Sequence, residues 1–228
     1  MIIMSAIPIE KSQNLSSFQK ACAKTQDRIM ESVFGNEGLP DAVLHGGALG
    51  WRVHGSGRFS CDIDLYSQNV DKQMLTRAFD VVGLNIVRFR DTGNVIYAKL
   101  ADATVGKKCS ISDFEIMKLP VEGEIAHYTK VDGTTIPVIA ISSDAMVKEK
   151  MLTYSNRTEM RDIYDIYYII TKVIGREGIS TVLANQLSDF LAGLKRPANE
   201  GNLGERIYSG NAPSFKQMTI ELAKAVRS

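Results

Sequence analysis

Residues 44–66 contain the side chains best suited to chemistry. A short apolar run leads into Gly46-Gly47, and a basic, glycine-rich loop then leads to a strand-like run that carries Asp62 and Asp64. Side chains two residues apart on a strand point to one face of the sheet, so both carboxylates are expected to face the same way. Neighbouring carboxylates repel unless a cation lies between them, and hard oxygen ligands combined with substrate phosphates suit Mg²⁺. The pattern predicts Asp62 and Asp64 as Mg²⁺ ligands.

The residues around this pair are suited to binding phosphate. Glycines let backbone amides approach phosphate oxygens closely, and the start of the short helix expected after Gly46-Gly47 favours anions. Arg58 and Ser60 precede Asp62 by four and two residues, where they could hold a triphosphate by charge and hydrogen bonding. We therefore predict Gly46, Gly47, Arg58 and Ser60 as nucleotide-binding residues. The alternative is a surface strand with solvated aspartates and an unrelated Gly-Gly turn.

A second group of charged residues lies on a helical pattern further along the chain. Asp162 and Asp165 are three residues apart, so they share one face of a helix. Lys150, on the preceding helical stretch, could reach a phosphate, and Asp165 could orient the nucleotide or that lysine. The alternative is a network of salt bridges between helices with no ligand.

The two blocks together resemble the AbiEii/AbiGii-type nucleotidyltransferases of the DNA polymerase β-like nucleotidyltransferase superfamily. The first block is Gly-Gly-Ala-Leu at 46–49 with Arg-Phe-Ser-Cys-Asp-Ile-Asp-Leu at 58–65, and the second is the lysine segment 145–151 with Arg-Asp-x-x-Asp at 161–165. The resemblance implies an enzyme that transfers a nucleoside monophosphate from an NTP to a hydroxyl of RNA or protein, with Mg²⁺. It also implies a toxin of a toxin–antitoxin or abortive-infection system, with a cognate antitoxin.

The sequence departs from this family pattern at two positions. Ala48 stands where the family usually has Ser or Thr, and Ser110 aligns with the usual third carboxylate. Asp113 is the nearest substitute, and we assign it as catalytic together with Asp62 and Asp64. Strict strand alternation places Asp113 on the face opposite Ser110, so a bulge would be needed to turn it toward the site.

These departures keep other functions open. A catalytically weakened nucleotidyltransferase fold could serve as a nucleotide-binding or partner-binding module. Asp-x-Asp also occurs in sugar-nucleotide glycosyltransferases that use Mn²⁺, but that interpretation leaves the Gly-Gly turn and the second block unexplained. A phosphatase of the Asp-x-Asp type fits poorly with Leu65-Tyr66 after the second aspartate.

Apolar spacing indicates the elements that must position these residues. Helical spacing covers 11–34, 71–82, 143–192 and the end of the chain from 214, and strand-like runs cover 42–44, 61–66, 85–90, 95–100, 108–117 and 135–141. We predict an α+β fold with a nucleotidyltransferase-like mixed sheet flanked by helices in residues 1–141. A helical domain follows in residues 142–228, with a long loop at 195–213.

Composition excludes several classes of protein. Lys+Arg total 27 and Asp+Glu total 26, so the net charge of +1 gives no global basic field for nucleic acid. The cysteine count is odd (3) and no Cys-x-x-Cys pair occurs, which argues against a disulfide framework or a zinc ribbon. No signal-peptide pattern begins the chain, and no run approaches the roughly 18 apolar residues of a membrane span. We expect a cytoplasmic protein without a membrane segment.

Overall fold

The computed structural model describes residues 9–35, 38–102 and 111–226. The chain forms two compact units. One consists of Met1–Val53 with Phe59–Ile141, and the other of His54–Arg58 with Ser142–Ser228. The short segment His54–Arg58, inserted just before the predicted metal ligands, therefore packs with the C-terminal unit, which the sequence did not indicate.

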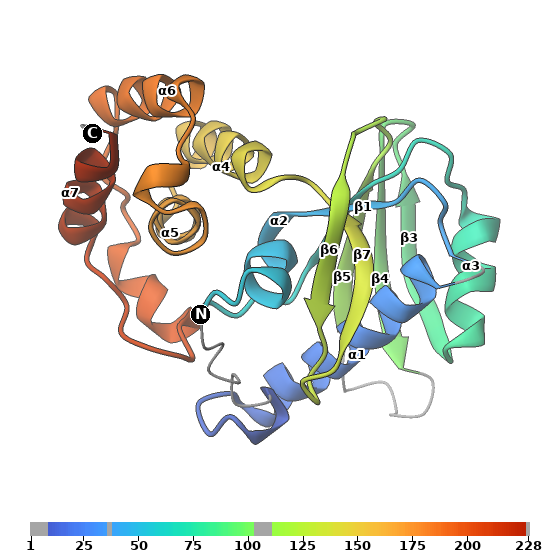
Figure 1. The fold of residues 1–228 in the computed structure, drawn as a ribbon. Coiled ribbons are helices and arrows are strands. Elements are labelled where there is room, and N and C mark those ends of the chain that lie inside the picture. Colours follow the sequence, from blue (N-terminus) through green and yellow to red (C-terminus); the bar gives the residue numbers. More distant parts are fainter. Residues whose placement is uncertain (1–8, 36–37, 103–110, 227–228) are drawn as a thin grey trace. The chain divides into compact units, whose positions relative to one another are not determined.

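The first unit contains a mixed sheet of seven strands in the order β3-β4-β5-β2-β1-β7-β6 (Figure 1). The strands are β1 (Val43–His45), β2 (Ile63–Tyr66), β3 (Leu84–Asp91), β4 (Val95–Asp102), β5 (Ile111–Met117), β6 (Glu124–Thr129) and β7 (Thr135–Ala140). The pairs β2–β5 and β1–β7 are parallel, and the other pairs are antiparallel. The site strands β2 and β5 are therefore neighbours although β3 and β4 separate them in sequence.

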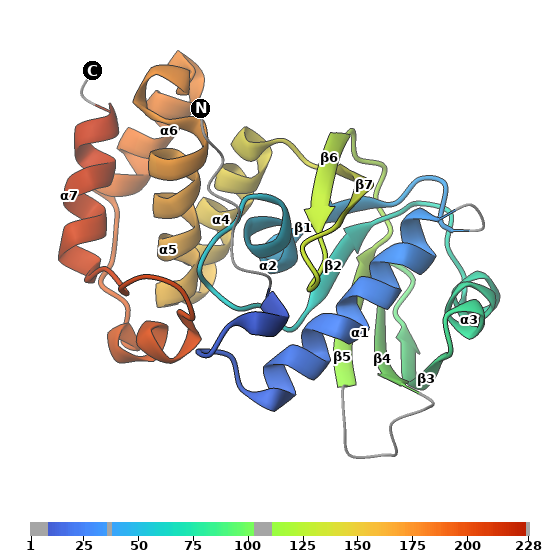
Figure 2. The same cartoon turned by 60° about the horizontal axis from the view of Figure 1, so that its bottom comes forward.

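Helices α1 (Ser17–Phe34) and α3 (Lys72–Val81) pack on one face of this sheet (Figure 2). A capping box between Ser16 and Gln19 starts α1. Phe79 of α3 meets Phe114 of β5 edge to face, with ring centroids 5.3 Å apart. Since the buried residues of β2 and β5 alternate with acidic ones, the apolar side chains face the helices and the acidic side chains face the opposite way.

Strand β1 leads directly into the glycine bend. The short helix α2 (Gly46–Ala48) begins there and continues as a π-helical segment, η2 (Leu49–Val53). A 3₁₀ turn, η1 (Ile9–Lys11), precedes α1. Strand β6 was missed from the sequence because it is an edge strand whose apolar residues do not alternate cleanly; Ile125, for example, is 74% exposed.

The second unit is helical. Its α-helices are α4 (Ser143–Arg157), α5 (Met160–Tyr168), α6 (Thr181–Ala192) and α7 (Phe215–Val226), joined by η3 (Ile169–Ile174), η4 (Arg176–Gly178) and η5 (Glu200–Arg206). Backbone and side-chain hydrogen bonds attach the inserted segment to this unit: Tyr168 Oη donates to the His54 carbonyl at 3.1 Å, and the Tyr208 amide donates to the Gly57 carbonyl at 2.9 Å. The predicted α+β fold with a C-terminal helical bundle is confirmed. None of the described helices combines the length and apolar character that a membrane crossing requires.

Candidate active site

Four carboxylates lie on the sheet face opposite α1 and α3. Asp64 of β2 is the register partner of Glu115 of β5, and Asp62 lies two residues before Asp64, on the same face. Neighbouring strands lie about 4.8 Å apart, so Asp64 and Glu115 are side by side. Asp113, two residues before Glu115, shares this face as well. The acidic side chains of two strands distant in sequence are thus brought together by one parallel strand pair.

A cavity of about 380 Å³ opens on this face. Its lining residues all belong to the first unit and are Asp62, Asp64, Arg88, Arg90, Tyr97, Ala98, Lys99, Asp113, Phe114 and Glu115. The predicted catalytic residues Asp62, Asp64 and Asp113 therefore share one cavity, together with Glu115.

The charges lining the cavity are ordered by strand. Arg90 of β3 pairs in register with Tyr97 of β4, which pairs with Glu115. Cations thus lie toward the β3 edge of the sheet, and carboxylates lie toward its centre. One ion pair joins a cation of β4 to a carboxylate of β5, because Lys99 Nζ lies 2.9 Å from Asp113 Oδ1. Asp113 is consequently partly neutralised, whereas no described residue forms an ion pair with Glu115.

Burial and neighbouring charges shift the pKa values of Glu115 and Cys61 in this site. Burial raises the pKa of Glu115, and the negative charges of Asp64 and Asp62 raise it further, while His45 opposes them. The Cys61 thiol donates to Asp62 Oδ1 at 3.2 Å. Burial and the Asp62 charge raise the pKa of Cys61 to about 11, so the thiol remains a protonated donor at neutral pH. The carboxylates therefore repel one another within a partly buried site.

The glycine bend touches the acidic pair directly. Gly46 has a positive φ of 73°, and a Cβ at this position would lie 2.1 Å from Asp64 Oδ2. His45, which precedes it, pairs in register with Asp64 and stacks on Tyr66 with ring centroids 4.0 Å apart. Only glycine leaves room for the Asp64 carboxylate to lie against this backbone. The bend and the Asp64 carboxylate therefore lie in direct contact.

The predicted residues Arg58, Lys150 and Asp165 gather in the second unit. Arg58 donates from Nε to Asp165 Oδ1 at 2.7 Å and from Nη2 to Oδ2 at 2.8 Å, and Lys150 Nζ lies 2.9 Å from the same Oδ2. Lys150 Nζ also lies 3.7 Å from Asp162 Oδ1, and Arg157 Nη2 lies 2.7 Å from the same oxygen. Burial alone would raise the pKa of Asp165, but the charges of Arg58 and Lys150 hold it below its ordinary value. The salt-bridge alternative thus describes what the structure contains, and phosphate contacts by Arg58 and Lys150 stay predictions.

One structural expectation was wrong. The pairing of β4 with β5 runs without a shift from Ile111 to Met117, so no bulge is needed to place Asp113 on the carboxylate face. Ser110, the aligned position, lies outside the described residues. Glu115 was missed, although Asp113-Phe114-Glu115 repeats the alternation of Asp62-Ile63-Asp64 and could have identified it. Two strands that alternate acidic and apolar residues in the same phase are a signal of a shared acidic face.

The remaining predicted residues have structural surroundings of their own. Ser60 is buried, and its carbonyl accepts a hydrogen bond from Gln26 at 3.0 Å. Gly47 and Ala48 are buried in α2. Ala48 has no hydroxyl, whereas the family pattern usually has Ser or Thr at this position. A phosphate contact at residue 48 would therefore involve its backbone and not its side chain.

Comparisons with known proteins identify the family and the fold. A family model described as "Nucleotidyl transferase AbiEii toxin, Type IV TA system" matches residues 28–222. The crystal structure of JHP933 from Helicobacter pylori has a similar fold, with a TM-score of 0.65, 18% identity and coverage of 93% of this chain and 92% of that chain. MenT4, a nucleotidyltransferase toxin from Mycobacterium tuberculosis, has a TM-score of 0.62, 15% identity and coverage of 96% and 86%.

At these identities the two structures show the fold, which is that of nucleotidyltransferases. A search of curated protein sequences found no match. The family model covers most of the chain. The chain therefore belongs to the AbiEii family of nucleotidyl transferase toxins of type IV toxin–antitoxin systems.

Proposed function

We propose that this protein transfers a nucleoside monophosphate from an NTP to a hydroxyl of an acceptor, in the presence of Mg²⁺, as the toxin of a toxin–antitoxin pair. The observation that carries the proposal is the group of Asp62, Asp64 and Glu115 on one sheet face, with Gly46 against Asp64. Family membership supports the toxin role and a cognate antitoxin as partner.

The donor set fits Mg²⁺. Asp62 and Asp64 offer carboxylate oxygens, and their charges raise the pKa of a third carboxyl beside them, so a cation would relieve repulsion that is present in the site. Among the described residues, no group of three or more His, Cys, Asp or Glu side chains is already arranged to hold a metal ion. Mg²⁺ is commonly bound by one or two carboxylates together with waters and substrate phosphates. Asp62 and Asp64 would hold the ion, which would stabilise charge on the phosphates during transfer.

The chain's own residues supply the other parts of the reaction. The backbone amides at Gly46 and Gly47 lie at a helix start, where they favour phosphate oxygens. The attacking hydroxyl must lose its proton as its oxygen approaches the α-phosphorus, and Glu115 is a carboxylate within the same cavity that can accept it. Pyrophosphate leaves. Arg58 and Lys150, which pair with Asp165 in the second unit, stay predicted phosphate ligands.

The cavity favours RNA over protein as the acceptor. The side chains of Arg88 and Arg90 are exposed, and no described residue forms an ion pair with either. Tyr97 lies beside Arg90 and is 42% exposed. Cations contact phosphodiesters, and an exposed aromatic ring can stack an unpaired base. An RNA whose end reaches Glu115 would cross these residues on strands β4 and β3.

The test is incubation of the protein with each radiolabelled NTP, Mg²⁺ and cell extract, followed by digestion of the product with ribonuclease or protease. We expect ribonuclease-sensitive label. Asp62→Ala should abolish labelling and growth inhibition, whereas Asp80→Ala, which removes an exposed carboxylate on α3, should change neither. If protease rather than ribonuclease removes the label, the acceptor is a protein and not RNA. If nothing is labelled and Asp62→Ala leaves growth inhibition intact, enzymatic action is excluded.

A catalytically weakened module remains the second candidate. Ala48 supports it, because one phosphate-contacting hydroxyl is missing. The placement of Glu115 beside Asp64 argues against it, because a third carboxylate is present. NTP binding by calorimetry without any transfer product would support the module.

A further inference from the structure

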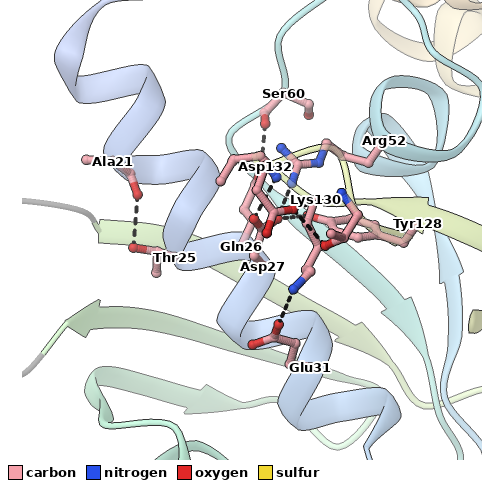
Figure 3. Close-up of polar contacts among 12 residues, drawn as sticks. Ala21, Thr25, Gln26, Asp27, Glu31, Arg52, Ser60, Tyr128, Lys130 and Asp132 are labelled. Carbon is pink, nitrogen blue, oxygen red and sulfur yellow. Dashed lines mark hydrogen bonds and ion pairs between the residues drawn. The ribbon is translucent and has the colours of Figure 1, made fainter. Parts of the chain in front are cut away.

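Helix α1 contacts the backbone that carries Asp62 just before it enters the sheet. Sheet pairing of β2 begins at Ile63, so the three residues before it must find other hydrogen-bond donors for their carbonyls. Gln26 supplies the main one. Its Nε2 donates to the Ser60 carbonyl at 3.0 Å (Figure 3). The same Nε2 lies 3.5 Å from the Asp62 carbonyl. The Gln26 side chain is fully buried, so water cannot replace this donor.

A second residue of α1 acts on the same segment. Cys22 lies one helical turn before Gln26 and faces the same way. Its Sγ lies 3.6 Å from the Cys61 carbonyl. Together, Cys22 and Gln26 contact three consecutive carbonyls, of Ser60, Cys61 and Asp62. The Cys61 thiol in turn donates to Asp62 Oδ1, so the side chain of Asp62 is oriented by a residue whose own backbone α1 holds.

The same helix holds the chain on the other side of the inserted segment His54–Arg58. Asp27, next to Gln26, accepts hydrogen bonds from Arg52 and, at 3.2 Å, from Tyr128 Oη (Figure 3). The Arg52 guanidinium is buried between aromatic rings, 4.7 Å from the Tyr128 centroid. Residues of α1 therefore bind the chain on both sides of the inserted segment. They bind the Arg52 side chain before it and the Ser60, Cys61 and Asp62 carbonyls after it.

We propose that Gln26 is a positioning residue for Asp62, which it fixes through the Ser60–Asp62 backbone. This inference rests on the proposed function, in which Asp62 holds the metal ion. Neither Gln26 nor Cys22 lines the cavity. Their effect on metal binding must therefore pass through the backbone of Asp62. Displacements of about 1 Å at a reacting centre can lower rates by about 10²-fold, so the loss of one buried donor can be large.

The test is Gln26→Leu, which keeps the approximate size of the side chain and removes its donor. Binding of Mn²⁺ alone, followed by electron paramagnetic resonance of the free ion, gives a readout that does not depend on turnover; Mn²⁺ prefers the same oxygen ligands as Mg²⁺. We expect Gln26→Leu to weaken Mn²⁺ binding about tenfold and to lower kcat more than it raises KM for the NTP.

Ser32→Ala is the matched control. Ser32 is also a buried residue of α1 and donates to a backbone carbonyl, that of Ala78, at 2.7 Å. Its removal should lower the unfolding temperature by a similar amount and leave Mn²⁺ binding unchanged. If Gln26→Leu and Ser32→Ala bind Mn²⁺ as the wild type does, the inference is overturned.

A second pair of variants decides the matter if Gln26→Leu does not fold. Cys22→Ala removes the other donor of α1, whereas Cys22→Ser keeps one. Weaker Mn²⁺ binding by Cys22→Ala than by Cys22→Ser supports the inference, and equal binding refutes it. The proposed function fails separately: if the wild type binds no Mn²⁺, or if Asp62→Ala binds it equally well, Asp62 is not a metal ligand and the inference falls with that role.

Discussion

The contact between Gly46 and Asp64 makes the sharpest prediction. Replacing Gly46 by Ala would place a Cβ 2.1 Å from Asp64 Oδ2 and 2.8 Å from Asp64 Cβ, whereas real Cβ atoms keep at least 3.0 Å. The aspartate or the bend must therefore move by roughly 0.9 Å, and such a shift at a reacting centre can lower the rate by about 10²-fold. We expect Gly46→Ala to lose about 99% of transfer activity.

The substitution also has a cost in stability that needs a control. A non-glycine residue at φ +73° is strained by about 1–2 kcal/mol, and overpacking in the core adds about 1–3 kcal/mol. Gly93 lies in the β3–β4 turn at φ +90°, and a Cβ there would meet nothing within 4 Å. Gly93→Ala should therefore show backbone strain alone. Urea unfolding and labelling assays on both variants separate the two effects.

One outcome would refute this reasoning. If Gly46→Ala retains activity comparable to that of Gly93→Ala, the position of Asp64 against the bend does not matter for transfer. The acidic pair and the glycine bend would then be separate features that happen to be adjacent.

Two further predictions concern the carboxylates. Glu115→Gln should lower the rate of transfer by about 10²–10⁴-fold, which is the usual contribution of a proton acceptor. Asp113→Asn should change the rate only a few-fold, because Asp113 is exposed and paired with Lys99. If Asp113→Asn instead lowers the rate more than Glu115→Gln does, Asp113 is the third carboxylate. Asp165→Asn should destabilise the protein by about 3–5 kcal/mol at neutral pH, since it leaves the buried charges of Arg58 and Lys150 without their carboxylate. Because the folded-state pKa of Asp165 is lowered, its stabilising contribution is present above its ordinary pKa of 3.8 and is lost as the pH falls through the lower folded value. Urea unfolding of the wild type and Asp165→Asn should therefore show a stability difference that narrows in acid, and a difference independent of pH would contradict this assignment.

The sequence alone determined the features that depend on local spacing. Two aspartates separated by one apolar residue on a strand must share a face, and Gly-Gly after a strand must form a permissive bend. The sequence also predicted an α+β part followed by a helical part, because the spacing of apolar residues indicates which face of each helix or strand is buried. These inferences need no knowledge of which elements are neighbours.

Tertiary structure alone decided which distant residues meet. Glu115 stands beside Asp64 because β2 pairs in parallel with β5, and that register is set by packing of the apolar residues that alternate with them. Arg58 binds Asp165, which follows it by 107 residues in the sequence. Strand register and salt-bridge partners depend on how the whole core packs, which no local spacing encodes.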